Sequence, residues 1–158
     1  MNEQVHRGRA CRGGGTGWLP AAVGGLASLG AGAIHLALTP THLDEWWGYG
    51  AFFLALGLFQ TAYGLPLLVP RLASWFMSRY APAGAIVNIA VIGLYIVTRT
   101  AGIPLGPEAG EAEGVGVPDT ISKLLEALIA GILIRHFIRY GRYEPRWRPG
   151  TTDEPDNE

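Results

Sequence analysis

Cysteine and charge are both scarce in this sequence. Cys11 is the single cysteine, so the chain can form no intramolecular disulfide and has no CxxC metal or redox motif. Charged residues make up 16%, against roughly 25% in soluble domains, and the 12 basic and 13 acidic residues almost cancel. No Gly-rich phosphate loop, nucleophile elbow or HExxH motif is present. These absences argue against a nucleic-acid partner and against common hydrolase, nucleotide-binding and zinc-protease chemistries.

Apolar residues are abundant instead, at 49%. They gather in four segments near the ~20 residues that an α-helix needs to cross a bilayer, although the third is shorter and the fourth carries charges. The alternation typical of a β-barrel is absent. We therefore predict an all-α protein, a transmembrane four-helix bundle over residues 17–140 with disordered cytoplasmic tails at 1–16 and 141–158. The spans are expected at about 18–38, 46–69, 83–99 and 121–138.

The first apolar segment also has features of a signal peptide. Three arginines precede it, and Ala31-Gly32-Ala33 resembles a small-residue cleavage site. The segment continues past that site to Leu38, which is long for a signal core. We therefore expect a retained first span, with cleavage as the alternative.

Basic residues lie almost entirely on one side of the predicted topology. The N-terminal tail, the link between spans two and three, and the C-terminal segment carry ten of the twelve, whereas the other two links are mainly acidic. Because Lys and Arg are enriched in cytoplasmic segments, we predict both termini on the cytoplasmic side of a bacterial cytoplasmic membrane. The Gly-, Pro- and Glu-rich segment 101–118 is then an irregular outer loop over the helix ends.

Prolines and acidic residues mark the predicted helix ends. Pro40-Thr41 followed by Asp44 is typical of an N-cap with an acidic residue in the first turn of span two. Pro82 stands where span three is expected to begin, a position that tolerates proline. Pro66 lies inside span two and should kink its inner end.

Each predicted span has one stripe of small or polar residues, which in lipid marks the packed face. In span one, Gly24, Ser28 and Gly32 form a small-residue face, and His35 follows on it and should point into the bundle. The same small-residue face is a candidate contact for a second copy of the chain or another membrane protein. The stripes of the other spans include His42, Tyr49, Phe53, Gln60, Asn88, Tyr95, Arg99, Asp119, Ser122 and Glu126.

The stripes predict a polar cluster in the outer half of the membrane. Glu126 lies within span four, where a charge costs roughly 2.5–3.5 kcal/mol at the bilayer centre and less near the interface. One hypothesis is a buried ion pair of Glu126 with Arg99, or with Lys123 on the same helix. His35 would then only hydrogen-bond a neighbouring helix, and the cluster would only fix the fold.

A second hypothesis makes the cluster a functional site. Imidazole and carboxylate groups suit a divalent transition metal such as zinc, copper, manganese or iron. His42 and Glu45 stand three residues apart, in the reverse order of the Glu-x-x-His unit of di-iron bundles. Without a metal, His35 and Glu126 are candidates for a proton relay. The candidate ligand set is His35, His42, Glu45 and Glu126, with Asp119 at its edge.

Two longer strings stand out beside these single residues. The first is H-x6-H-x2-EWWGYG-x-FF, ending at Phe53, and the second is N-x10-RT-x-GIPLGP-x-AG, from Asn88 to Gly110. Together they resemble a group of small bacterial integral membrane proteins with four spans and no assigned activity. The resemblance covers roughly residues 30–130 and implies a four-span topology, but no catalytic residue.

The function expected from the sequence is that of a non-enzymatic structural or accessory membrane protein. The alternative is a metal-binding or proton-coupled, transport-linked protein that uses His35, His42, Glu45 and Glu126. A membrane enzyme with this cluster as its active site is the least favoured reading.

Overall fold

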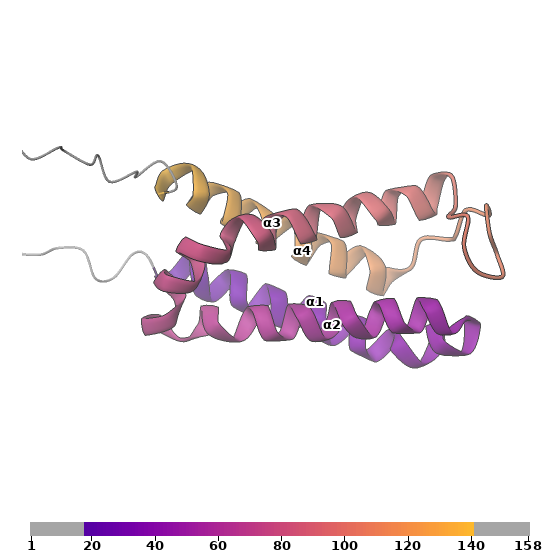
Figure 1. The fold of residues 1–158 in the computed structure, drawn as a ribbon, viewed down its shortest axis with the longest axis horizontal. Helices are drawn as coiled ribbons and strands as arrows, with labels where there is room; N and C mark the ends of the chain where they lie inside the picture. The colour runs from indigo at the N-terminus through magenta and orange to yellow at the C-terminus, as the bar shows by residue number, and fades with distance from the viewer. Residues whose placement is uncertain (1–17, 141–158) are drawn as a thin grey trace, which may run out of the picture.

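The structure is a computed structural model that describes residues 18–140, so the predicted tails at 1–16 and 141–158 lie outside it. The described residues form four α-helices and no strand. They are α1 (Trp18–Glu45), α2 (Trp47–Leu68), α3 (Pro70–Thr100) and α4 (Val117–Tyr140) (Figure 1). The predicted all-α class is confirmed, and α1, α2 and α3 are long and apolar enough to cross a membrane.

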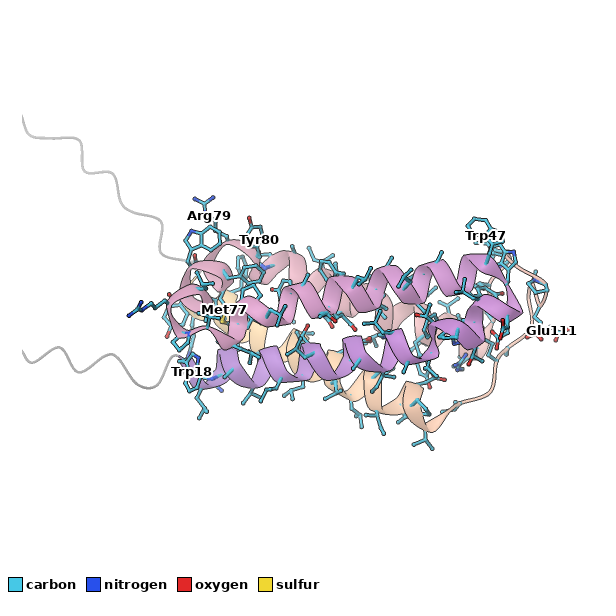
Figure 2. The ribbon with its side chains drawn as sticks, turned by 90° about the horizontal axis from the view of Figure 1, so that it is seen from below. Trp18, Trp47, Met77, Arg79, Tyr80 and Glu111 are labelled. Atoms are coloured by element: carbon cyan, nitrogen blue, oxygen red, sulfur yellow. The ribbon has the colours of Figure 1, made fainter. Side chains whose placement is uncertain are left out.

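The four helices lie roughly alongside one another in an elongated bundle (Figure 1). The connection between α1 and α2 lies at the same end of the bundle as the irregular segment 101–116, and we call this the loop end. Figure 2 places Trp47 and Glu111 there, and Trp18 and Arg79 at the opposite end. The pairing of α1 with α2 is the most extensive, and α2 and α3 make far fewer contacts with each other.

Helix α1 is longer than expected, because it continues through Pro40 to Glu45. The break comes at a single residue, Trp46, whose backbone is extended and which provides no side-chain cap for α2. The predicted N-cap at Pro40-Thr41, with Asp44 in the first turn of the second helix, is therefore wrong. Asp44 lies in the last turn of α1, and the change of direction takes one residue instead of a capped turn.

Helix α3 also begins earlier than expected. It starts at Pro70, the first helical position, where a missing N–H leaves no intrahelical bond unmade. Pro82, expected at the start of the span, lies inside α3. The first turns of α3 cross the end of the bundle before the helix runs along its length (Figure 1). A proline inside a helix removes one intrahelical bond and favours such a bend.

Small residues bring α1 and α2 into close contact. A Cβ atom added at Gly25 would lie 2.9 Å from the carbonyl oxygen of Gly64, so both backbones need glycine there. The predicted small-residue face of α1 also packs inside the bundle. Gly24, Ser28 and Gly32 are all buried within the chain, and the Ser28 hydroxyl donates to the carbonyl oxygen of Gln60 at 2.7 Å. Its proposed use as a contact for a second copy or another protein is therefore wrong.

The interior differs between the two ends of the bundle. Toward the end opposite the loops, the core is a cluster of alanines and larger apolar residues that includes Tyr63, Leu67, Met77, Ile129 and Leu133. Toward the loop end, buried polar residues replace them. Glu126, Gln60, His35 and Ser122 are each at most 3% exposed. The candidate site is built from this polar half.

Candidate functional site

Glu126, on α4, is the centre of the buried polar residues and is completely inaccessible to solvent. Its Oε1 accepts hydrogen bonds from His35 Nε2 of α1 at 2.9 Å and from Gln60 Nε2 of α2 at 3.0 Å. Its Oε2 accepts a bond from Lys123 Nζ, one turn earlier on α4, at 2.6 Å. We call these four residues the Glu126 cluster. It joins three of the four helices through one carboxylate.

The charges of the Glu126 cluster balance without a charged histidine. A buried charge needs a partner and hydrogen bonds to offset its desolvation, and Lys123 supplies the one positive charge that Glu126 requires. A carboxylate only accepts hydrogen bonds, so Nε2 of His35 must carry the proton. With His35 neutral, its Nδ1 atom is an acceptor. That atom is buried and has no hydrogen-bond partner among the described residues.

Arg99 does not pair with Glu126. Its guanidinium forms ion pairs with Glu113 and with Asp119, the latter at 2.7 Å. The prediction of an Arg99–Glu126 pair is therefore wrong, and Lys123, the other partner considered, takes this role. The reason is the 101–116 segment, which folds back so that the backbone N–H of Glu113 donates to Thr98 at 3.0 Å. This brings Glu113 to the end of α3, where it competes for Arg99.

The predicted metal ligands fall into two separate pairs. His35 bonds Glu126, whereas His42 Nδ1 bonds Glu45 Oε2 at 2.8 Å within the last turn of α1. Phe53 of α2 contacts both imidazoles, with ring centroids 5.3 Å from His35 and 3.9 Å from His42. Asp119 is held by Arg99. Within residues 18–140, no group of three or more His, Cys, Asp or Glu side chains is arranged to hold a metal.

A cavity of about 300 Å³ lies beside these residues at the loop end. All four helices and the 101–116 segment contribute to its wall. Most of the wall is aromatic or aliphatic, and a smaller number of polar side chains converge on it. The apolar part includes Trp46, Tyr49, Phe52, Phe53, Leu94 and Tyr95, and the polar part is His35, His42, Thr98, Arg99, Glu113, Asp119 and Lys123.

The loop is fastened over the cavity at two places. The Tyr49 hydroxyl, at the start of α2, donates to the carbonyl oxygen of Leu105 at 2.7 Å. On the other side, Arg99 holds Glu113 while its guanidinium lies 4.8 Å from the centre of the Tyr95 ring. Tyr49 belongs to the first of the two sequence strings described above, and Leu105 belongs to the second. Their contact agrees with the expectation that 101–118 folds over the helix ends.

Sequence reasoning found part of this site and missed part of it. His35, Glu126, Asp119 and Lys123 were identified as polar residues near the outer end, and Tyr49, Phe53, Gln60 and Tyr95 lay on the predicted inward stripes. Their roles were missed because a stripe shows which face is packed, not which residues enclose a space. Glu113 was missed as a partner because nothing in a Gly-rich loop indicates where it folds back.

Comparison of the chain with protein-family models, with curated proteins and with solved structures gave no match. The resemblance based on the two strings therefore stays a prediction.

Proposed function

We propose that this protein is a non-enzymatic, four-span protein of the bacterial cytoplasmic membrane that binds a small, mostly apolar molecule in the loop-end cavity. The main support for this proposal is the cavity itself. Ligand sites are typically clefts or cavities of about 300–1,000 Å³ with apolar walls and a few converging polar groups, and this cavity has that character at the small end of the range.

The proposal takes α4 as the fourth span. Its charged residues lower its mean hydropathy, but Glu126 is fully buried and the Lys123 side chain is only 14% exposed. The exposed face of α4 is largely apolar and includes Leu124, Leu128, Ile134, Phe137 and Ile138. Two exposed arginines, Arg135 and Arg139, lie in the last turns of α4. A helix that buries its other charges and turns apolar side chains outward suits a lipid environment, because arginines near a helix end can reach the interface.

The proposed orientation has both termini in the cytoplasm. The start of α1 and the end of α4 lie at the same end of the bundle, as an even number of spans requires (Figure 1). Figure 2 shows Arg79 at this end and Glu111 at the loop end. By the helix bounds, Arg71 at the start of α3 and Arg135 and Arg139 in the last turns of α4 also lie toward this end, whereas Glu108 and Glu113 belong to the loop-end segment. The positive-inside rule then puts the loop end, with the cavity, outside.

A purely structural or accessory role is the second candidate, and the Glu126 cluster favours it. One carboxylate receives hydrogen bonds from α1, α2 and α4, which specifies how these helices pack. This role accounts for the buried charge but not for a mostly apolar cavity beside it. The two roles are compatible, because the cluster can fix the helices that form the cavity wall.

A proton-coupled transport role has less support. The chain of polar contacts runs from His35 at the cavity through Glu126 to Gln60. Beyond Gln60, the described core toward the other end consists of residues such as Leu67, Ile129 and Leu133. A relay across the membrane needs titratable groups or water over its whole length.

Ligand binding can be tested with 2-methylnaphthalene as an apolar probe. The purified full chain in lipid nanodiscs would be dialysed against the probe, with empty nanodiscs as the reference for partitioning into lipid. We expect saturable binding that Leu94→Trp abolishes, because Leu94 lines the cavity and tryptophan would fill it. Leu128→Trp, on the exposed face of α4, is the matched control and should bind normally. Binding unaffected by Leu94→Trp, or no binding beyond partitioning, contradicts the proposal.

Topology can be tested by cysteine labelling in a Cys11→Ser background. Arg79→Cys and Glu111→Cys lie exposed at opposite ends of the bundle (Figure 2). In intact cells, a membrane-impermeant maleimide should label the cysteine at position 111 and leave the one at position 79 unlabelled. The reverse pattern would mean that both termini are outside. Equal labelling of both would contradict a helical bundle that spans the membrane.

A further inference from the structure

We infer that the cavity opens to the lipid between α2 and α3, and that its ligand is an uncharged, lipid-soluble molecule that enters from the bilayer through this opening. This inference rests on the proposed ligand-binding function, and it specifies the class of the ligand and its route into the cavity.

The specific contacts between α2 and α3 lie toward the end of the bundle opposite the loops. There the Tyr63 hydroxyl donates to the carbonyl oxygen of Tyr80 at 3.0 Å, and the centre of the Tyr63 ring lies 5.0 Å from that of Phe76. Nearer the loop end, no hydrogen bond, ion pair or ring contact joins α2 to α3 within residues 18–140. Among helices that follow one another in the chain, these two pack least extensively. The boundary between α2 and α3 is therefore weakly joined beside the cavity.

Phe52 of α2 and Leu94 of α3 lie where the cavity meets the outer surface of the bundle. Both line the cavity, yet they are 40% and 37% exposed. Consecutive side chains on an α-helix point about 100° apart. The next residue on each helix faces another neighbour, because Phe53 packs against the imidazoles of α1, and the Tyr95 ring centre lies 5.8 Å from Nζ of Lys123 on α4. Phe52 and Leu94 are thus turned away from α1 and α4, and they form the rim of an opening between α2 and α3.

The segment 101–116 covers the cavity at the loop end, and this cover is fastened. The Tyr49 hydroxyl donates to the carbonyl oxygen of Leu105, and Arg99 pairs with Glu113. A ligand that enters at the loop end would have to break these contacts. A ligand that enters between α2 and α3 would only have to move apolar side chains at the rim. The route between the two helices therefore leaves the polar contacts of the site intact.

The chemistry of this route selects the ligand. Helix α2 contains no charged residue, and α3 contains none between Arg79 and Arg99, so the helices on both sides of the opening are uncharged there. In the proposed topology this surface contacts lipid, where a charged ligand would have to give up its hydration. Inside the cavity, Arg99 and Lys123 are already paired with carboxylates, so a charged ligand would gain no free counter-ion. An uncharged molecule dissolved in the bilayer meets neither cost.

The route is tested with a naphthyl group that cannot leave the bilayer. The probe is a phosphatidylcholine in which a 4-(2-naphthyl)butanoyl group replaces one acyl chain, and it competes with 2-methylnaphthalene for the full chain in nanodiscs. A helix is about 10 Å across, so this short linker cannot carry the ring over the helix ends while the other acyl chain holds the lipid in place. At about ten times its own dissociation constant in the lipid, the probe should raise the apparent dissociation constant of 2-methylnaphthalene roughly tenfold.

The same lipid with an unmodified butanoyl chain is the control and should leave the binding of 2-methylnaphthalene unchanged. So should 2-naphthalenesulfonate and trimethyl(2-naphthyl)ammonium, which keep the ring but add a charge. If the tethered naphthyl group does not compete while free 2-methylnaphthalene binds, the ligand enters at the loop end, and the inference is overturned while the proposed function stands. Competition by either charged probe would overturn the uncharged class of ligand. If 2-methylnaphthalene itself does not bind, the inference and the proposed function both fail.

Discussion

His35 and Glu126, 91 positions apart in the chain, meet in the interior with Nε2 of the imidazole 2.9 Å from Oε1 of the carboxylate. The contact links the first helix to the last. It also connects the two parts of the site, because His35 lines the cavity whereas Glu126 does not. One imidazole thus contributes a donor to the buried network while its side chain forms part of the cavity wall.

Replacing the central carboxylate should destabilise the bundle. Glu126→Leu leaves the Lys123 ammonium buried without a counter-ion and removes the acceptor of His35 and Gln60, so we expect a loss of about 3–5 kcal/mol in the free energy of unfolding. Lys123→Met in the same background removes the orphaned charge and should restore part of that loss. Reversible unfolding in mixed detergent micelles measures both. If the double variant loses as much free energy of unfolding as the Glu126→Leu and Lys123→Met single variants together, the ion pair does not stabilise the fold.

Arg99 and Glu126 should act almost independently. We expect the coupling energy of Arg99→Gln with Glu126→Gln to stay within about 0.5 kcal/mol, because the two side chains share no direct contact. The matched cycle of Arg99→Gln with Glu113→Gln should show a coupling of up to about 1 kcal/mol, limited by the exposure of Glu113. If Arg99 couples more strongly to Glu126 than to Glu113, the Arg99–Glu126 ion pair predicted from the sequence exists after all.

The sequence was sufficient for features that depend on local composition and periodicity. Apolar length predicted the helices, and helical spacing placed His35, Gln60 and Glu126 on inward faces. The sequence was not sufficient to choose between two prolines as the first residue of α3. Pro70 and Pro82 both satisfy the rule for a helix start, and the choice depends on whether residues 70–82 find packing partners. Ala73, Met77 and Ala81 are buried in the core, so they do.

The polar partners could not be derived for a related reason. The sequence puts Glu126 within reach of two cations, Arg99 at the same predicted level and Lys123 on its own helix, which allows more than one pairing. The fold of the 101–116 segment selects among them, because it brings Glu113 to Arg99 and leaves Lys123 to Glu126. That fold depends on glycines with positive φ at positions 102, 106 and 110, and it is not encoded in helical periodicity. The choice of ion-pair partners for Arg99 and Glu126 therefore depends on the fold of a loop that the sequence predicted only to be irregular.

Two glycines of α3 should respond in opposite ways to alanine. A Cβ at Gly84 would collide with the Tyr63 hydroxyl and lie 2.8 Å from Leu133, so Gly84→Ala should cost about 1–3 kcal/mol through overpacking. Gly93 has open space around it, and Gly93→Ala should be neutral or stabilise by up to about 1 kcal/mol. Unfolding of the two variants under identical conditions checks the contrast. Equal effects would mean that α3 does not pack on Tyr63 as described.

The loop over the cavity should depend on Gly106 more than on Gly110. Both have positive φ, at 86° and 83°, so alanine at either position meets the same backbone penalty of roughly 1–2 kcal/mol. A Cβ at Gly106 would also lie 2.5 Å from the Tyr49 hydroxyl, whereas a Cβ at Gly110 meets nothing. Gly106→Ala should therefore break the bond from Tyr49 to Leu105 and release the loop from α2.

Hydrogen exchange of the hydrogen-bonded loop amides of Glu111 and Glu113 measures that release. We expect faster exchange in Gly106→Ala than in Gly110→Ala, and an intermediate rate in Tyr49→Phe, which removes the hydroxyl without a collision. Because Leu105 belongs to the cavity wall, the affinity for 2-methylnaphthalene should fall in the same order. If exchange increases while affinity stays constant, the loop covers the cavity without contributing to binding, and the ligand would contact only the helices.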